Sequence, residues 1–402
     1  MKDSNEIETS NQKYKDFNET FKYCTFGLAM GLLYPNRSNV RKRQFYCVVV
    51  VLINGFTLFW FCMYLYKCIT IVDLYNLSNN ITIGVLITIF FFKLIYCNYK
   101  TEEFAVLLEK ISSDLLKANE LAEDYQEIYD DYIRQAKVGQ MLWLLIPVLV
   151  SSQFPIYAGC GLIYITFKND AMDRRGYMVH EMQLKFLEDK QYETPYFEIM
   201  FAYTCIQCIT LAPNFAGFDG SFCIATTHLR MKLHIMLHNL RKCFKEAKDS
   251  SDIRRKLKST VMEHQEAVAF YEELQDIYGS WLLTIFLLTS LLISMNIYQL
   301  YLSDHINAKY TMFGISSVLH MFAPCYYAST LTKYSEDLSS EIYSVPWEVD
   351  MDPWVIRILT FMITKSQQRM ILTGNGMVVY NMELFISIMQ TSYSLFTLIT
   401  MT

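Results

Sequence analysis

Polar side chains recur at helical spacing in the last apolar stretch of the chain, which runs from Met377 to the end. On a helix turning by about 100° per residue, five of them fall within an arc of roughly 80°, with Thr391 at its edge. These five are Glu383, Ser387, Gln390, Ser394 and Thr397. Polar side chains in a membrane need a polar partner or water, so a continuous polar stripe suggests a wetted path, such as one wall of a pore that symmetric copies would close. Alternatively, the hydroxyls bond to carbonyls one turn back or join neighbouring helices.

The elements that would carry this stripe are membrane helices. The chain is 52% hydrophobic and 15% aromatic, and it contains several nearly uncharged apolar runs long enough to cross a bilayer. We predict an all-α polytopic membrane protein with seven transmembrane helices, at 45–66, 81–97, 141–167, 197–218, 281–302, 311–331 and 377–402. The first span would act as its own signal anchor, because residues 1–44 are polar and show no cleavable signal. The formal net charge of −5 is too mild to suggest a nucleic-acid partner.

Basic residues predict the orientation, because cytoplasmic flanks of membrane spans retain Lys and Arg. Arg37, Arg41, Lys42 and Arg43 precede the first span, and the densest basic stretch of the chain lies between the fourth and fifth spans. Both clusters fall on one side if the N-terminus is cytoplasmic. An odd number of spans then places the C-terminus outside the cell.

The connecting segments complete the predicted organisation. We expect a cytoplasmic N-terminal segment (1–44), transmembrane helices 1–4 (45–218), cytoplasmic helical extensions (219–280), helices 5 and 6 (281–332), a cytoplasmic segment with a short anchor helix (333–376) and the final helix (377–402). His228, His234 and His238 share a helical stretch, but no acidic residue accompanies them there, so we predict no metal site. Cys68 and Cys160 could form one bridge on the outer side. The sequence suggests no cofactor.

Several stretches together resemble the insect odorant receptor family over the whole chain. They are HLRMKLHIMLHNLR, HQEAVAFYEELQDIYGSWLL, YSEDLSSEIYSVPWEVD, KSQQRMILTGNG and MELFISIMQTSYSLFTL. The resemblance implies an odorant-gated non-selective cation channel in the plasma membrane of olfactory sensory neurons. In this family a ligand-tuned subunit joins a shared co-receptor in a heterotetramer whose last helices line the pore. The co-receptor carries a long extra insert in the fourth-to-fifth loop that is absent here, which implies a ligand-tuned subunit.

The resemblance also implies site residues. Ligand in this family binds among the outer halves of helices 2–6, and the residues that fit by position are Phe154, Tyr157, Phe201, Tyr203, Tyr298, Phe313 and Ser317. A volatile ligand would be held there by aromatic contacts and oriented by a few hydroxyls. The expected pore-lining residues are Ser387, Gln390, Thr391, Ser394 and Thr397, and the gate candidates are Phe396, Thr397 and Ile399. We expect His320 to be a satisfied core histidine rather than a sensor.

Other function classes fit the sequence less well. A G-protein-coupled receptor is the alternative with about seven spans, but it needs an outer N-terminus, whereas the basic clusters predict an inner one. The sequence also lacks an Asp-Arg-Tyr after the third span and an Asn-Pro-x-x-Tyr in the seventh. A secondary transporter would show repeated halves, and we see no internal repeat. An enzyme is not expected, because Gly-rich phosphate loops, HExxH and paired carboxylates within a span are missing from the sequence.

Overall fold

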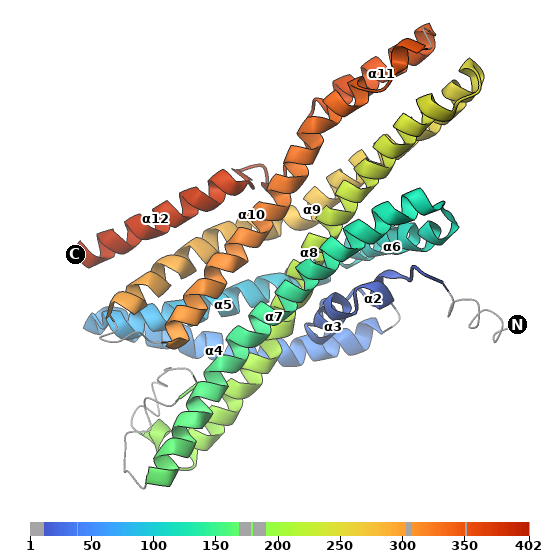
Figure 1. Ribbon diagram of the computed structural model, residues 1–402. Helices are drawn as coiled ribbons and strands as arrows, with labels where there is room; N and C mark the ends of the chain where they lie inside the picture. The colour runs from blue at the N-terminus through green and yellow to red at the C-terminus, as the bar shows by residue number, and fades with distance from the viewer. Residues whose placement is uncertain are drawn as a thin grey trace, which may run out of the picture.

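The structure is a computed structural model that describes residues 12–37, 39–168, 178–179, 190–302, 308–349 and 352–401. Within these residues the chain forms a bundle of long helices and one short hairpin (Figure 1). The α-helices are α2 (Phe17–Thr20), α3 (Lys22–Met30), α4 (Val40–Ile71), α5 (Leu74–Tyr99), α6 (Thr101–Lys117), α7 (Glu123–Lys168), α8 (Tyr196–Glu246), α9 (Ser250–Leu302), α10 (Ala308–Tyr343), α11 (Pro353–Ser366) and α12 (Met382–Met401). Short 3-10 turns occupy Ala118–Glu120, Lys190–Tyr192 and Trp347–Val349. The prediction of an all-α architecture is confirmed.

Five helices in the described part of the chain are long and apolar enough to cross a membrane by length and composition. They are Val40–Ile71, Asn76–Tyr99, Glu123–Phe167, Tyr196–Glu246 and Ser250–Leu302, and they contain the first five predicted spans. The sixth and seventh predicted spans fall on α10 and α12. A total of seven transmembrane helices stays a prediction, as does the orientation of the termini.

Helices α8 and α9 are much longer than a membrane crossing requires. They contain 51 and 53 residues, which at about 1.5 Å per residue is more than twice the roughly 30 Å of a bilayer core. Both helices therefore continue well beyond the apolar layer. Figure 1 shows the turn between them at the same end of the molecule as α11 and the α6–α7 connection. The basic stretch between the fourth and fifth spans thus belongs to a helical extension rather than to a linker.

The polar N-terminal segment contributes two helices to the core, which the sequence did not lead us to expect. Phe17, Phe21, Cys24 and Leu28 are all buried. Helix α3 packs directly on α8 at a pair of glycines, where a Cβ added to Gly217 would lie 2.4 Å from the backbone nitrogen of Leu28. Only glycine allows the two backbones to approach so closely.

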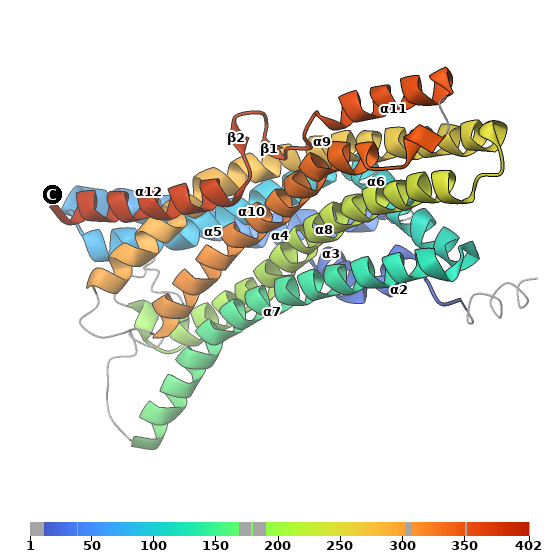
Figure 2. The same cartoon turned by 45° about the horizontal axis from the view of Figure 1, so that its top comes forward.

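A short hairpin joins α11 to α12 and holds the start of α12 against α9. Strands β1 (Thr373–Gly374) and β2 (Val378–Val379) pair antiparallel across a turn that contains Gly376 at φ +72°. The Gln275 side chain of α9 donates to the Thr373 carbonyl at 2.7 Å and accepts from the Thr373 amide at 2.8 Å. The hydroxyl of Tyr380 donates to the Leu282 carbonyl. The hairpin lies between α11 and α12, beside α9 (Figure 2), so the position of α12 is fixed at its first turn.

Candidate functional site

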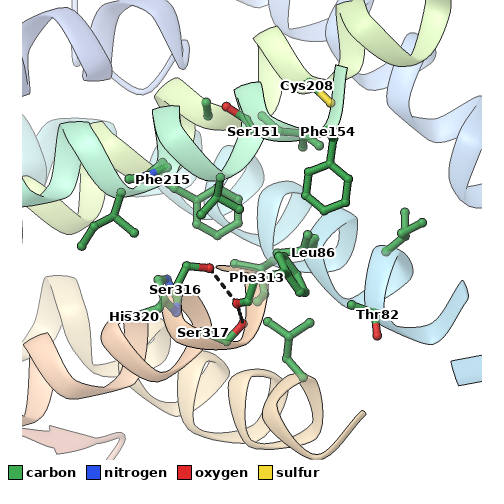
Figure 3. A pocket seen from close by; sticks show the side chains of 18 of the residues that line it. Thr82, Leu86, Ser151, Phe154, Cys208, Phe215, Phe313, Ser316, Ser317 and His320 are labelled. Atoms are coloured by element: carbon green, nitrogen blue, oxygen red, sulfur yellow. Dashed lines mark hydrogen bonds between the residues drawn. The ribbon is translucent and has the colours of Figure 1, made fainter. Parts of the chain in front are cut away.

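An apolar cavity of about 130 Å³ lies among α5, α7, α8, α9 and α10. The aromatic residues Trp143, Phe154, Phe215 and Phe313 line it. Figure 3 shows the last three of them around the cavity. The rings of Phe154 and Phe313 meet edge to face with 6.0 Å between their centroids. An apolar cavity of about 150 Å³ is enough to bind benzene in other proteins, so this cavity can hold a small organic molecule.

The cavity occupies one half of the bundle. Its α10 residues, such as Phe313, and most of its α5 residues, such as Thr82, lie in the first halves of those helices. Its α7 residues other than Trp143 lie in the second half of that helix. This is the half that the basic flanks predict to be outermost. The position agrees with the expected location of a ligand among the outer halves of the second to sixth spans.

Three of the seven predicted ligand-binding residues line this cavity, namely Phe154, Phe313 and Ser317. The other four lie outside its lining. Tyr157 is exposed on α7, Tyr298 is buried in α9, and Phe201 packs against the small apolar cluster around Ala158 and Cys208. The hydroxyl of Tyr203 donates to the Ile53 carbonyl at 2.6 Å, which binds α8 to α4. Because these four lack contact with the cavity, we leave them out of the site proposed below.

The sequence analysis missed several residues of the lining, and one signal could have found some of them. Phe313, Ser316, Ser317 and His320 recur at the i, i+3, i+4, i+7 spacing of one helix face, and all four line the cavity. Ser317 and His320 were considered separately from the sequence, and Ser316 was overlooked. The contributions of Thr82, Ser151 and Phe215 depend on how α5, α7 and α8 pack, which the pattern of one helix does not reveal.

A buried ionic cluster adjoins the cavity through His320. The Lys93 ammonium of α5 lies 2.6 Å from a carboxylate oxygen of Asp219 on α8, and both side chains are 0% exposed. The other oxygen of Asp219 lies 3.1 Å from Nε2 of His320, which also lines the cavity. The remaining ring nitrogen, Nδ1, lies 3.2 Å from the Thr289 hydroxyl of α9. His320 therefore is a satisfied core histidine, as expected, and at the same time part of the cavity wall.

The polar stripe of α12 faces away from the bundle. Glu383, Ser387, Gln390, Thr391 and Ser394 are exposed to differing degrees, and Thr397 is partly exposed. Ser392 and Ile388 occupy the buried side, where the Ser392 hydroxyl donates to the Ser290 carbonyl of α9 at 3.3 Å. At about 100° per residue, Ser392 lies roughly opposite the centre of the stripe. Figure 1 shows α12 along one edge of the molecule, so the stripe is open to whatever surrounds the subunit.

Hydroxyls of the stripe also bond within the helix, as the alternative interpretation of the sequence allowed. Thr391 donates to the Ser387 carbonyl at 2.8 Å, and Ser394 donates to the Gln390 carbonyl at 2.9 Å. These bonds use the hydroxyl protons and leave the oxygen lone pairs facing outward, where they can contact water or a cation. Back-bonding and a hydrated face are therefore compatible in this helix.

The gate candidates lie near the end of α12. The Phe396 ring lies 5.5 Å from the Tyr301 ring of α9 and 6.0 Å from the Tyr393 ring, measured between centroids. Thr397 donates to the Ser394 carbonyl at 2.8 Å. The side chain of Ile399 lies outside the part of the chain that the structure describes.

Two of the three histidines of the helical extension pair with acids from other helices. Nε2 of His228 lies 3.1 Å from Asp114 of α6, and Nε2 of His238 lies 2.7 Å from Asp124 of α7. Hydrogen bonds from Lys242 and His238 lower the pKa of Asp124 to about 2. Among the described residues, no three His, Cys, Asp or Glu side chains are grouped to hold a metal ion. Cys68 and Cys160 are both free, so the bridge between them that the sequence allowed is wrong.

Comparisons with known proteins agree on one family. A family model described as "7tm Odorant receptor" matches residues 73–393. Odorant receptor 94a of Drosophila melanogaster is 21% identical over 313 residues, which cover 75% of this chain and 74% of that protein. Odorant receptor 82a of the same species is 26% identical over 211 residues, covering 52% of this chain and 54% of that protein. The match therefore spans about half the length of the second relative.

A solved structure has the same fold. The insect olfactory receptor OR5 from Machilis hrabei, in complex with eugenol, superimposes with a TM-score of 0.77 at 14% identity. The alignment covers 94% of this chain and 97% of that one. A second structure of the same receptor gives a TM-score of 0.73. At this level of identity the likeness shows the fold, with nearly the whole chain included.

Proposed function

Because this chain belongs to the odorant receptor family, whose model matches residues 73–393, we propose that it is a subunit of an odorant-gated, non-selective cation channel. Its relatives in that family are receptors, so the chain is a receptor and not an enzyme. Olfactory reception by a helical membrane protein is the function class that follows. The ligand, the pore and the partner subunit are the parts of the proposal that need separate argument.

A small organic compound is the proposed ligand of the cavity among α5, α7, α8, α9 and α10. The cavity is walled by aromatic and aliphatic side chains and includes a few hydroxyls, which is the composition expected of a site for a volatile, mostly apolar molecule. OR5 of Machilis hrabei, which shares this fold, was solved in complex with eugenol. That complex supports a small-molecule ligand for this chain.

The exposed polar stripe of α12 is the observation that carries the channel proposal. A lipid-facing helix would normally present apolar side chains, yet the outward side of α12 carries the polar stripe, flanked by the exposed Ile386, Tyr393 and Leu398, while Ile388 is buried against the bundle. Symmetric packing of several subunits would place such stripes around one axis and enclose a hydrated path. Glu383 in the first turn adds a negative charge at one end of the stripe, which favours cations.

A heterotetramer with the family co-receptor in the plasma membrane of an olfactory neuron is the proposed assembly. One helix provides only one wall of a pore, so partner subunits are needed to close it. The basic flanks support a cytoplasmic N-terminus and cytoplasmic helical extensions, and membrane lipid would then contact the exposed side of α4. Gating requires that ligand binding in the cavity changes the packing of α12. Residues 396, 397 and 399 remain the gate candidates.

Current measurements in heterologous cells test this proposal. We expect a panel of volatiles to evoke cation current when the chain is expressed with the co-receptor, and we expect this current to persist when G-protein signalling is blocked. Gln390→Ala should change the ratio of calcium to sodium permeability, because Gln390 lies on the outward-facing stripe. Ser392→Ala is the matched control, since this polar residue lies on the buried side of the same turn.

Two results would overturn the channel proposal. Current that disappears under the blockade would return the seven-helix metabotropic receptor as the better explanation. Equal permeability changes in the Gln390 and Ser392 variants would mean that the exposed stripe has no special role in conduction. In that case the hydroxyls of α12 would be structural.

A further inference from the structure

We infer that the adjacent serines Ser316 and Ser317 form a subsite for a ligand hydroxyl, so that this receptor selects alcohols over the corresponding ketones. The inference rests on the proposed function, because it assigns the chemical class of the molecule that the cavity binds. The inference depends on which acceptors the hydroxyl groups of the cavity already donate to.

Both serine hydroxyls donate to one carbonyl. Oγ of Ser316 lies 2.8 Å and Oγ of Ser317 lies 2.9 Å from the carbonyl oxygen of Phe313, one turn earlier on α10. Figure 3 shows the two hydroxyls converging on this oxygen within the cavity wall. In an α-helix the same carbonyl also accepts the backbone N–H four residues later, which is that of Ser317. Three donors thus share an oxygen that has two lone pairs.

Because the carbonyl is shared, one serine hydroxyl can turn its proton away from it at low cost. A carbonyl with three donors keeps good geometry with two of them, so turning one hydroxyl toward the cavity costs less than breaking an unshared hydrogen bond. The other serine keeps its proton on the carbonyl and presents its oxygen lone pairs. The pair can therefore offer one donor and one acceptor side by side.

An alcohol matches this pair and a ketone matches half of it. The oxygen of an alcohol can accept a hydrogen bond from the serine hydroxyl that has turned toward the cavity. The alcohol can at the same time donate its own proton to the oxygen of the second serine. A ketone can only accept, so the second interaction is lost. Two other hydroxyls of the lining are arranged differently, because Thr82 donates to the Ser78 carbonyl at 2.9 Å and Ser151 donates to the Val148 carbonyl at 3.3 Å, each alone.

The surrounding groups leave few competing partners for the ligand. Both ring nitrogens of His320 are engaged, by Asp219 and by Thr289. The indole N–H of Trp143 donates to the Cys223 sulfur at 3.0 Å. The serine pair therefore offers a donor and an acceptor together next to aromatic rings, and Gln207 and Tyr310 are other hydrogen-bonding side chains of the lining.

The test compares cyclohexanol with cyclohexanone, two ligands of one carbon skeleton and close to benzene in size. The full chain, purified in detergent, is titrated with each compound, and the half-saturating concentration is taken from the rise in its thermal unfolding midpoint. We expect cyclohexanol to saturate at a concentration about fivefold lower, the ratio that one hydrogen bond of about 1 kcal/mol provides. Ser316→Ala and Ser317→Ala should each bring the ratio close to one. Ser317→Thr should restore the preference, because it keeps a hydroxyl at that position.

Ser151→Ala is the matched control, since it removes a cavity serine whose proton goes to a carbonyl of its own. It should leave the alcohol-to-ketone ratio unchanged. Equal binding of both compounds to the wild-type chain, or the same loss of preference in the Ser151 variant, would overturn the serine-pair inference while leaving the cavity as a ligand site. Binding of neither compound would mean that the cavity is no site for molecules of this size, and both the proposed ligand site and the serine pair would then fall.

Discussion

The ion pair between Lys93 and Asp219 should be the most sensitive point of the bundle to single substitutions. Both side chains are fully buried and their charged atoms lie 2.6 Å apart, within helices α5 and α8. Removing one member of a buried pair leaves an uncompensated charge, which costs about 3–5 kcal/mol. Since each 1.4 kcal/mol is about a tenfold change, the ratio of folded to unfolded protein should fall by roughly two to three and a half orders of magnitude.

The two single substitutions should differ in severity. Asp219→Asn removes the carboxylate charge that compensates the Lys93 ammonium, which then keeps only neutral partners such as the Phe215 ring, 4.1 Å away. Lys93→Met should be milder, because His320 lies 3.1 Å from Asp219 and can supply a positive charge when it takes up a proton. The double variant, which combines Lys93→Met with Asp219→Asn, carries no unpaired charge. The amide introduced at position 219 keeps an oxygen that can accept from the His320 N–H. We therefore expect the double variant to approach the stability of the wild type.

Thermal unfolding of the detergent-purified chain, followed by tryptophan fluorescence, measures these effects. Lys100→Met provides a matched control on the same helix end, since Lys100 pairs with the exposed Asp276 at 2.7 Å. Exposed pairs contribute about 1 kcal/mol or less. If Asp219→Asn destabilises no more than Lys100→Met, or if the double variant is as unstable as the two singles combined, the reasoning from burial is refuted.

Two further predictions concern packing and pH. Gly217→Ala should lower the unfolding midpoint by the equivalent of about 1–3 kcal/mol, because the added Cβ would meet the α3 backbone at 2.4 Å. Gly314→Ala is the control and should be neutral or stabilising, because nothing lies within 4 Å of a Cβ added there. Similar midpoints for the two variants would contradict the packing argument. Burial and the charge of Lys365 lower the pKa of His264 on α9, so the unfolded chain, with a histidine pKa of about 6.5, binds the proton more tightly. The contribution of His264 to stability should be complete above about pH 6.5 and should decline as the pH falls below it. The His264→Gln variant should lose less stability than the wild type between about pH 7.5 and 5.5. An identical loss in both proteins would assign the effect to other groups.

The sequence by itself determined the class of this protein and the character of its last helix. Apolar runs of membrane length specify helices because a bilayer offers no water to unpaired backbone groups. The spacing of Glu383, Ser387, Gln390 and Ser394 specifies one polar face because helical geometry depends only on sequence separation. The resemblance to the odorant receptor family was also visible in the sequence, and the family model confirmed it.

Tertiary structure decided which residues meet across helices. Asp219 lies 126 positions after Lys93 and 101 positions before His320 in the sequence, so no local pattern pairs these residues. Tyr203 and Tyr298 looked suitable for a ligand by position, but the rotation of α8 and α9 leaves them outside the cavity lining, while the same packing brings Ser316 and Thr82 into its wall. Likewise, the exposure of the α12 stripe follows from the contact of Ser392 and Ile388 with the bundle. Helix periodicity defines faces, and only the packing of helices against one another decides what each face touches.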